Sequence, residues 1–165
     1  MPRISFVFPI YNESGNIELL HRTMREVTAG LEEELEFLYV NDGSRDDSLR
    51  LLRGLADVDP SVTVIDLSRN HGHQIAVTAG LDAATGDAVV VMDADLQDPP
   101  EVALALIAKW RDGYDVVYAQ RRTREDTWFK KTTASAFSRT LNWLSDIEIP
   151  RDTGDFRLVS RRALD

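Results

Sequence analysis

The sequence predicts an α/β fold of three layers, in which a mostly parallel central sheet carries helices on both faces. Short apolar runs rich in β-branched residues alternate along the chain with amphipathic helical patterns, and short loops connect them. Strand–helix–strand units of this kind are right-handed and build parallel sheets. No internal repeat or low-complexity linker interrupts the pattern, so we expect residues 1–165 to form a single domain.

Five apolar runs are expected as strands because each is short, rich in β-branched or aromatic residues and followed by a turn or helix signal. Pro9 ends the first run, and Asn41-Asp42-Gly43-Ser44 follows the second. The fourth run, Ala88 to Met92, is apolar enough for a strand that is buried on both faces. The expected strands are residues 4–9, 36–40, 62–67, 88–92 and 114–119.

The segments between these runs show helical periodicity, with apolar side chains recurring at steps of three and four residues. The stretch Asp98-Pro99-Pro100-Glu101 predicts a helix start, with Asp98 as the N-cap and Glu101 closing a capping box. The expected helices span residues 17–31, 74–84 and 99–113, and a further helix after Ser44 carries Leu49, Leu52 and Leu55.

The composition excludes several classes of protein. A formal net charge of −9 argues against nucleic acid as a partner. The chain contains no cysteine, so neither a disulfide framework nor thiol chemistry is expected. No apolar run is long enough to cross a bilayer, and Met1-Pro-Arg leads straight into a strand. We therefore expect a soluble chain without a signal peptide.

The charge is unevenly distributed along the chain. Residues 1–113 contain 9 Lys and Arg against 20 Asp and Glu, whereas residues 114–165 contain 10 against 8. Surface solvation alone often produces such an asymmetry. An acidic first part and a basic second part nevertheless suggest two different roles.

Ligands of parallel α/β sheets bind at the carboxyl ends of the strands, so the loops there are the candidate site. In this chain they are residues 9–15, 41–46, 68–72 and 93–98. They bring a set of carboxylates to one edge of the sheet, namely Glu13, Asp42, Asp93, Asp95 and Asp98.

Asp93 and Asp95 follow the buried fourth run directly. Side chains alternate along a strand, so the two carboxylates are expected on the same side, where they repel unless a cation lies between them. Carboxylate oxygens suit Mg²⁺ or Mn²⁺, whose open positions phosphate oxygens fill. The loops contain neither Gly-x-Gly-x-x-Gly nor a P-loop, so a diphosphate at this acidic edge needs a divalent ion. The stretch predicts a metal–diphosphate site.

Each of these residues also has a structural alternative. Asp42 with Gly43 can be a plain turn, and Glu13 can be a charge favoured by the dipole of the following helix. His71 and His73 lie in one loop, but without cysteine or a His-x-x-x-His helix they do not predict a zinc site.

A basic segment follows the fifth strand. Six Lys and Arg residues lie between positions 121 and 139, and Trp128, Phe129, Phe137, Leu141 and Leu144 are interleaved with them. The basic side chains are suited to a phosphate, and the apolar ones to the core or to a lipid. Asp152 to Leu158 then predicts a turn that enters a short strand, in which Asp155 is a turn residue or a functional one.

Four strings taken together resemble glycosyltransferase family 2, whose members have the GT-A fold. They are Pro9-Ile-Tyr-Asn-Glu13, Asn41-Asp-Gly-Ser44, Asp93-Ala-Asp-Leu-Gln-Asp-Pro-Pro-Glu101 and Gly154-Asp-Phe-Arg-Leu158. The last two are similar to those of the polyprenyl-phosphate glycosyltransferases, the group of dolichol-phosphate mannose synthases and bacterial undecaprenyl-phosphate sugar transferases. Asn41 departs from the family, which commonly has Asp there.

The resemblance implies a nucleotide-sugar-binding part at 1–113 and an acceptor-binding part at 114–165. It implies that the nucleotide is held by Pro9, Tyr11, Glu13, Asp42 and Asp93. It implies that Mg²⁺ or Mn²⁺ and the donor phosphates are surrounded by Asp93, Asp95 and Gln97.

The resemblance also implies the chemistry, an inverting displacement at the anomeric carbon of the sugar. Asp155 and Asp95 would be catalytic, with Asp155 beside the acceptor, and Arg121 and Lys131 would contact the acceptor phosphate. The donor would be a UDP- or GDP-sugar and the acceptor undecaprenyl or dolichyl phosphate. Relatives continue into membrane-associated helices, so we expect the intact protein to work at the cytoplasmic face of the cell membrane.

Two other functions are compatible with a parallel sheet and a metal. A nucleotidyltransferase that makes a sugar nucleotide normally needs a Gly-rich first loop, for which Tyr11-Asn12-Glu13 is a poor substitute. A nucleotide-sugar-binding module without turnover is the non-enzymatic alternative, and it suits this chain alone better than a longer protein.

Overall fold

The computed structural model describes residues 1–120 and 153–165 and divides the chain into two compact units. The larger unit consists of Met1–Tyr118 and Asp155–Asp165 and contains nearly all of the sheet. Ala119–Gly154 forms the smaller unit, most of which lies outside the described residues.

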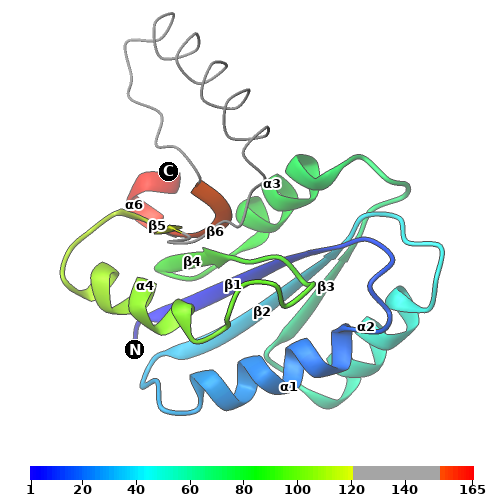
Figure 1. The fold of residues 1–165 in the computed structure, drawn as a ribbon, viewed down its shortest axis with the longest axis horizontal. Helices are drawn as coiled ribbons and strands as arrows, with labels where there is room; N and C mark the ends of the chain where they lie inside the picture. The colour runs from blue at the N-terminus through cyan, green and yellow to red at the C-terminus, as the bar shows by residue number, and fades with distance from the viewer. Residues whose placement is uncertain (121–152) are drawn as a thin grey trace, which may run out of the picture. The chain divides into compact units, whose positions relative to one another are not determined.

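Strands and helices alternate along the larger unit, as the sequence predicts (Figure 1). Every expected strand is present, with bounds shifted by at most two residues. The elements are β1 (Arg3–Ile10), α1 (Ile17–Thr28), β2 (Glu34–Asn41), α2 (Ser48–Val58), β3 (Val62–Asp66), α3 (His73–Ala83), β4 (Ala88–Val91), α4 (Val102–Arg111), β5 (Val116–Gln120), β6 (Thr153–Ser160) and α6 (Arg161–Leu164).

The strands form one mostly parallel sheet in the order β3-β2-β1-β4-β6-β5. β1 lies parallel to both β2 and β4, and β2 lies parallel to β3. The short strand expected to follow the turn within Asp152–Leu158 is β6, which pairs antiparallel with β4 and separates it from β5. Nothing in the sequence places β6 between these two strands, because its pairing joins segments about seventy residues apart.

Helices cover both faces of the sheet, which confirms the three layers. On one face Phe6 and Phe8 of β1 stack on Phe37 and Tyr39 of β2, beneath α1. Side chains alternate along a strand, so the neighbouring residues point to the other face. There they pack against α3 in a buried cluster with Val7, Leu38, Val40, Ala76 and Val77.

Gly80 allows α3 to approach the sheet closely. A Cβ at this position would lie 2.3 Å from Cγ1 of Val7 and 3.1 Å from Cγ2 of Val40. The glycine therefore fixes α3 against β1 and β2, and with it the loop that precedes the helix.

Two sequence expectations about helix ends are wrong. α1 ends at Thr28 rather than Leu31. α4 begins at Val102 with Glu101 as its N-cap, so the helix starts three residues later than the expected N-cap Asp98 implies. The reason is the Pro99-Pro100 pair, because a proline disfavours helical backbone at the residue before it.

His21 of α1 is the centre of a buried polar network between α1, β2 and the end of α2. Its Nδ1 lies 3.0 Å from Oη of Tyr39, and its Nε2 lies 3.2 Å from Oδ2 of Asp59. Arg25 approaches the same Asp59 oxygen at 3.6 Å. Burial lowers the pKa of His21 and outweighs the opposing attraction of Asp59. Folding therefore favours the neutral imidazole.

The free energy of unfolding is expected to fall as the pH drops from about 7.5 to about 5.5. The unfolded chain takes up a proton at His21 near the ordinary pKa of about 6.5, whereas the folded chain resists it until lower pH. His21→Gln removes this titrating group, so its stability should depend less on pH over the same window. Urea denaturation at several pH values measures both slopes, and equal slopes would exclude His21 as the source.

Candidate active site

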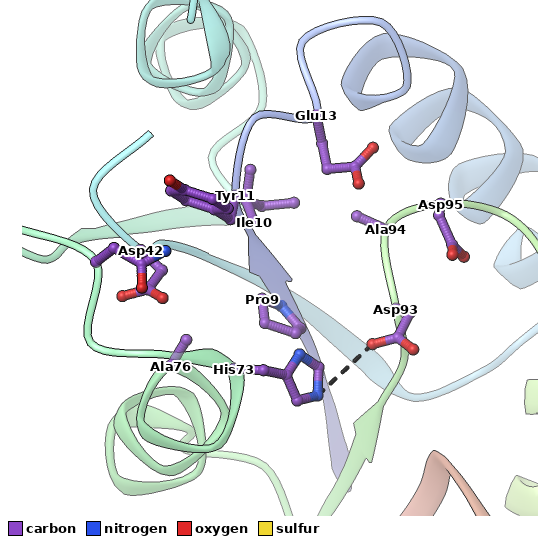
Figure 2. Close-up of a pocket in the computed structure, with 11 residues that line it drawn as sticks. Pro9, Ile10, Tyr11, Glu13, Asp42, His73, Ala76, Asp93, Ala94 and Asp95 are labelled. Atoms are coloured by element: carbon purple, nitrogen blue, oxygen red, sulfur yellow. Dashed lines mark ion pairs between the residues drawn. The ribbon is translucent and has the colours of Figure 1, made fainter. Parts of the chain in front are cut away.

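A pocket of about 270 Å³ lies at the carboxyl ends of the parallel strands (Figure 2). Four successive strands contribute the segments that follow them, as expected for ligand sites in such sheets. The lining residues are Pro9, Ile10, Tyr11, Glu13, Asp42, Asn70, His73, Ala76, Asp93, Ala94 and Asp95.

The pocket brings together most of the site residues that the sequence predicts. Six of them line it, namely Pro9, Tyr11, Glu13, Asp42, Asp93 and Asp95. Gln97 is exposed beside the pocket and does not line it. Arg121 and Lys131 lie outside the described residues, and of Asp155 the structure describes only its place in β6.

That place in β6 relates Asp155 to the acidic stretch. Val91 of β4 pairs with Arg157 of β6 in antiparallel register. Along the two strands, Asp93 lies two residues beyond Val91 and Asp155 two residues before Arg157. Each aspartate therefore lies two residues from the same Val91–Arg157 pair, Asp93 in the turn after β4 and Asp155 within β6.

His73 and Asn70 are lining residues that the sequence interpretation missed as site residues. Asn70 lies in the loop after β3, and His73 is the first residue of α3. The available signal was Gly72-His73 at the start of a helix that follows a strand, the position at which such sheets hold anionic ligands.

The loop after β1, residues 9–15, is joined by hydrogen bonds between backbone amides and side chains to the loop after β2, residues 41–46, and to the start of α2. The amides of Asn12 and Glu13 donate to Oγ of Ser44 and of Ser48, at 2.9 and 3.0 Å. The Ser14 amide donates to Asp46 at 3.0 Å, and the Arg45 amide donates to Oδ1 of Asn12 at 2.8 Å.

Asp46 is the main acceptor of this loop network. Desolvation opposes its ionisation, but hydrogen bonds from Ser48 and Ser14 outweigh that effect and lower the pKa of Asp46 to about 2. The carboxylate stays charged at neutral pH. The network thus fixes the backbone from which Tyr11 and Glu13 extend into the pocket.

Asp42 links the third loop, residues 68–72 after β3, to the second loop, residues 41–46 after β2. Its carboxyl group is buried, and it accepts from the His71 amide at 2.7 Å and from the Gly72 amide at 2.9 Å. Asp42 is therefore more than a plain turn residue. Each carboxylate oxygen has two acceptor sites, so capacity remains for a ligand donor as well.

Gly43 lets these loops touch. Its φ of 64° is left-handed, and a Cβ there would lie 2.3 Å from the carbonyl carbon of Arg69 and 2.5 Å from the amide nitrogen of Asn70. Only glycine allows the backbone of the third loop to lie directly on the second. This contact brings Asn70 and His73 to the pocket.

The acidic side of the pocket differs from the sequence expectation in one respect. β4 ends at Val91, so Asp93 and Asp95 lie in the turn that follows, and strand alternation does not decide where they point. Oδ1 of Asp95 accepts from the Gln97 amide at 3.0 Å, across Leu96, whose φ of 58° is left-handed. A left-handed leucine costs about 1–2 kcal/mol, a local strain typical of functional sites.

The donor groups of this turn fit a hydrated divalent ion better than a closed metal site. Within residues 1–120 and 153–165, no group of three or more His, Cys, Asp or Glu side chains is arranged to hold a metal ion. Asp93 has 40% of its side chain exposed, and Asp95 is exposed. Mg²⁺ and similar hard ions usually bind one or two carboxylates and complete their shell with water and substrate phosphates.

The family model for glycosyl transferase family 2 matches residues 5–165. The chain belongs to glycosyltransferase family 2. Its relatives include the uncharacterized glycosyltransferase YkcC of Bacillus subtilis, which is 53% identical over 162 residues and matches 98% of the chain. The bactoprenol glucosyl transferase of Shigella phage SfX is 42% identical over 164 residues and matches 99% of the chain.

The chain spans about half the length of these relatives, 50% of the Bacillus protein and 54% of the phage protein. None of the helices in the described part of this glycosyltransferase chain combines the length and apolar character that a membrane span requires.

Solved structures of glycosyltransferases share the fold. A mannosyltransferase from Pyrobaculum calidifontis, in complex with GDP-Man and Mn²⁺, has a TM-score of 0.68 at 23% identity, over 98% of this chain and 45% of its own. The glucosyl-3-phosphoglycerate synthase of Mycobacterium tuberculosis, with Mn²⁺, UDP and phosphoglyceric acid, has a TM-score of 0.67 at 24% identity, over 98% and 56%. This family 2 domain therefore has the GT-A fold, as the sequence predicts.

Gly43→Ala is expected to lower the stability of the domain. The left-handed backbone alone costs about 1–2 kcal/mol for a non-glycine residue, and the new Cβ would displace the Arg69–Asn70 peptide. Gly54→Ala is the matched control, because Gly54 lies within α2 with open space around it. The control should gain about 0.5–1 kcal/mol. Urea denaturation measures both changes, and a neutral Gly43→Ala variant would contradict the close approach of the loops.

Proposed function

We propose that the intact protein is an inverting glycosyltransferase that transfers a sugar from a nucleoside-diphosphate sugar to a polyprenyl phosphate. One observation carries the proposal. The pocket of a family 2 domain has a buried carboxylate, Asp42, at one end and an exposed carboxylate pair, Asp93 and Asp95, at the other. Relatives named bactoprenol glucosyl transferase, at 42% identity, support a polyprenyl phosphate as the acceptor.

The nucleoside would occupy the Asp42 end of the pocket. The Tyr11 side chain lines it with 44% of its surface exposed, so its ring offers a face on which a base can stack. Figure 2 shows this ring between Asp42 and Glu13. Pro9 lies at the base of the pocket, and a remaining lone pair of Asp42 would accept an N–H of the base.

The diphosphate would lie at the opposite end. Asp93 and Asp95 would hold Mg²⁺ or Mn²⁺, with Gln97 beside them, and the ion would neutralise the charge of the departing nucleoside diphosphate. The complexes of the fold neighbours with Mn²⁺ support a divalent ion in such a pocket. The carboxylates fix where the ion binds and so orient the donor.

The transfer itself would be one in-line displacement. An oxygen of the acceptor phosphate forms a bond to the anomeric carbon while the bond from that carbon to the diphosphate oxygen breaks, which inverts the configuration. A phosphate monoester with a second pKa of about 6 is largely dianionic at neutral pH and needs little help from a base. Asp155, from β6, would therefore orient the acceptor more than deprotonate it.

The acceptor would be held by the basic part of the chain, residues 114–165. Arg121 follows β5 directly, and a guanidinium is suited to bidentate contact with a phosphate. Lys131 would add a second positive charge. A polyprenyl tail requires a membrane surface, so the intact protein would work at the cytoplasmic face of the cell membrane through segments beyond the acceptor-binding part.

Nucleotide binding is expected to depend on a divalent metal. UDP or GDP should bind about tenfold or more weakly in EDTA than with Mn²⁺, and Asp95→Ala should remove most of this difference. Calorimetry with UDP- and GDP-sugars, each with Mn²⁺, with Mg²⁺ or without metal, also identifies the preferred nucleotide and ion. Equal affinity with and without metal would contradict the site.

Asp42→Ala is expected to weaken nucleoside diphosphate binding by about 1–3 kcal/mol, because a base donor would lose its buried acceptor. A modified nucleotide separates this contact from the role of Asp42 in holding the loop. If the base is uracil, the wild type should prefer UDP to N3-methyl-UDP, whereas the variant should not discriminate. A variant with unchanged affinity for both nucleotides would leave Asp42 a loop anchor only.

Arg121→Ala in the full-length protein is expected to impair use of a polyprenyl phosphate far more than donor binding. Transfer assays with undecaprenyl phosphate and with a simple sugar acceptor measure the preference. Arg22→Ala is a suitable control, because Arg22 is an exposed side chain on α1 outside the pocket. Preference for the simple sugar would point to another branch of the family, and release of pyrophosphate would point to nucleotidyl transfer.

A further inference from the structure

We propose that His73 is a positioning residue for Asp93, whose imidazole holds one carboxylate oxygen and leaves the other to a divalent ion. This inference rests on the proposed function, because it assigns a role within the donor pocket. It concerns a residue that neither the family strings nor the sequence interpretation singled out as functional.

The geometry brings the two side chains toward each other across the pocket. His73 extends from the first turn of α3, and its ring points at Asp93 in the turn after β4 (Figure 2). Nε2 of His73 lies 3.7 Å from Oδ1 of Asp93. This separation is longer than a hydrogen bond and within the range of direct attraction between an imidazole N–H and a carboxylate. The exposed fractions are 38% and 40%, so both side chains remain accessible to a ligand.

The backbone that carries His73 is held in place at the start of α3. Gly72 precedes the helix with a φ of 95°, a conformation that favours glycine. The Gly72 amide donates to Asp42, and the Ile75 and Ala76 amides donate to the Gly72 carbonyl, at 3.1 and 3.2 Å. The start of α3 is thus fixed at the end of the pocket where the nucleoside would bind.

The chemistry of the pocket gives such a residue a task. Asp93 and Asp95 are close in sequence, and their two carboxylates repel each other. Nε2 of His73 faces Oδ1 of Asp93, and this ring nitrogen can carry an N–H toward the carboxylate. Partners of this kind orient metal-binding carboxylates, and their loss typically weakens metal binding about 10–100-fold.

The same arrangement links the two ends of the pocket. Asp42 fixes Gly72, Gly72 fixes the first residue of α3, and His73 reaches Asp93. The site of the nucleoside and the site of the metal are therefore joined by one short segment of backbone.

Calorimetry with Mn²⁺ and UDP or GDP tests the inference without relying on activity. His73→Ala should weaken the Mn²⁺-dependent binding of the nucleotide about 10–100-fold and leave metal-free binding nearly unchanged. His73→Gln keeps an N–H donor at similar reach and should retain most of the metal effect. His71→Ala is the matched control, because His71 is exposed and is not among the residues that line the pocket. Its hydrogen bond to Asp42 comes from the backbone amide, which the substitution keeps.

The outcomes separate this inference from the proposed function. If the wild type binds nucleotide in a metal-dependent way and His73→Ala binds it equally well, the role of His73 is overturned and the metal site stands. The role would also be overturned if His73→Ala weakened metal-free binding as much as metal-dependent binding and lowered the melting temperature. Such a result would indicate a structural role in starting α3. Wild-type protein that binds nucleotide equally with and without Mn²⁺ would overturn both the metal site and this role.

Discussion

The pocket depends on one buried carboxylate. Asp42 accepts two backbone amides of the loop after β3 and so links this third loop, residues 68–72, to the second, residues 41–46. A buried carboxylate is costly unless it is hydrogen-bonded, and here two N–H groups compensate for its desolvation. Gly43 makes the arrangement possible, because any side chain there would collide with the Arg69–Asn70 peptide. The same two residues thus shape the pocket before any ligand binds.

Asn41 shows how the neighbouring position adapts to this constraint. Its side-chain Nδ2 donates to Oδ1 of Asp66 at 2.8 Å, and its side-chain Oδ1 accepts from the Ser44 amide at 3.3 Å. An aspartate, which the resemblance makes the common residue here, would place two carboxylates against each other at a buried position. The asparagine therefore ties the end of β2 to the end of β3 without charge repulsion, and the departure from the family leaves the pocket intact.

The sequence predicted the order of strands and helices because both depend on local periodicity, which a single chain displays. It predicted the pocket residues Glu13, Asp42 and Asp93 because the ends of parallel strands meet at one edge, whereas Tyr11 followed from the family resemblance. It could not predict β6 between β4 and β5, since antiparallel pairing across seventy residues has no local signal. The capping-box pattern predicts the start of α4 too early, because Pro100 disfavours helical backbone at Pro99 and delays the helix to Val102. His73 was missed because a histidine in a loop has no periodic signal, and only the packing of α3 on the sheet aims it at Asp93.

The position of β6 has a consequence for how donor and acceptor meet. Within the part of the chain that the structure describes, the residues that line the pocket lie between positions 9 and 95, in the acidic part of the sequence. β6 comes from the basic part, yet it pairs with β4, the strand that leads into Asp93. In antiparallel register Val91, the last residue of β4, pairs with Arg157 in the middle of β6, so Asp155 lies two residues before this pair along β6 and Asp93 two residues after it along the turn. The β4–β6 pairing therefore holds two backbone positions, each two residues from an aspartate: Asp93, proposed for the donor, and Asp155, proposed for the acceptor. Rigid elements position reacting groups more accurately than loops do, and an in-line displacement between two bound phosphates requires that accuracy.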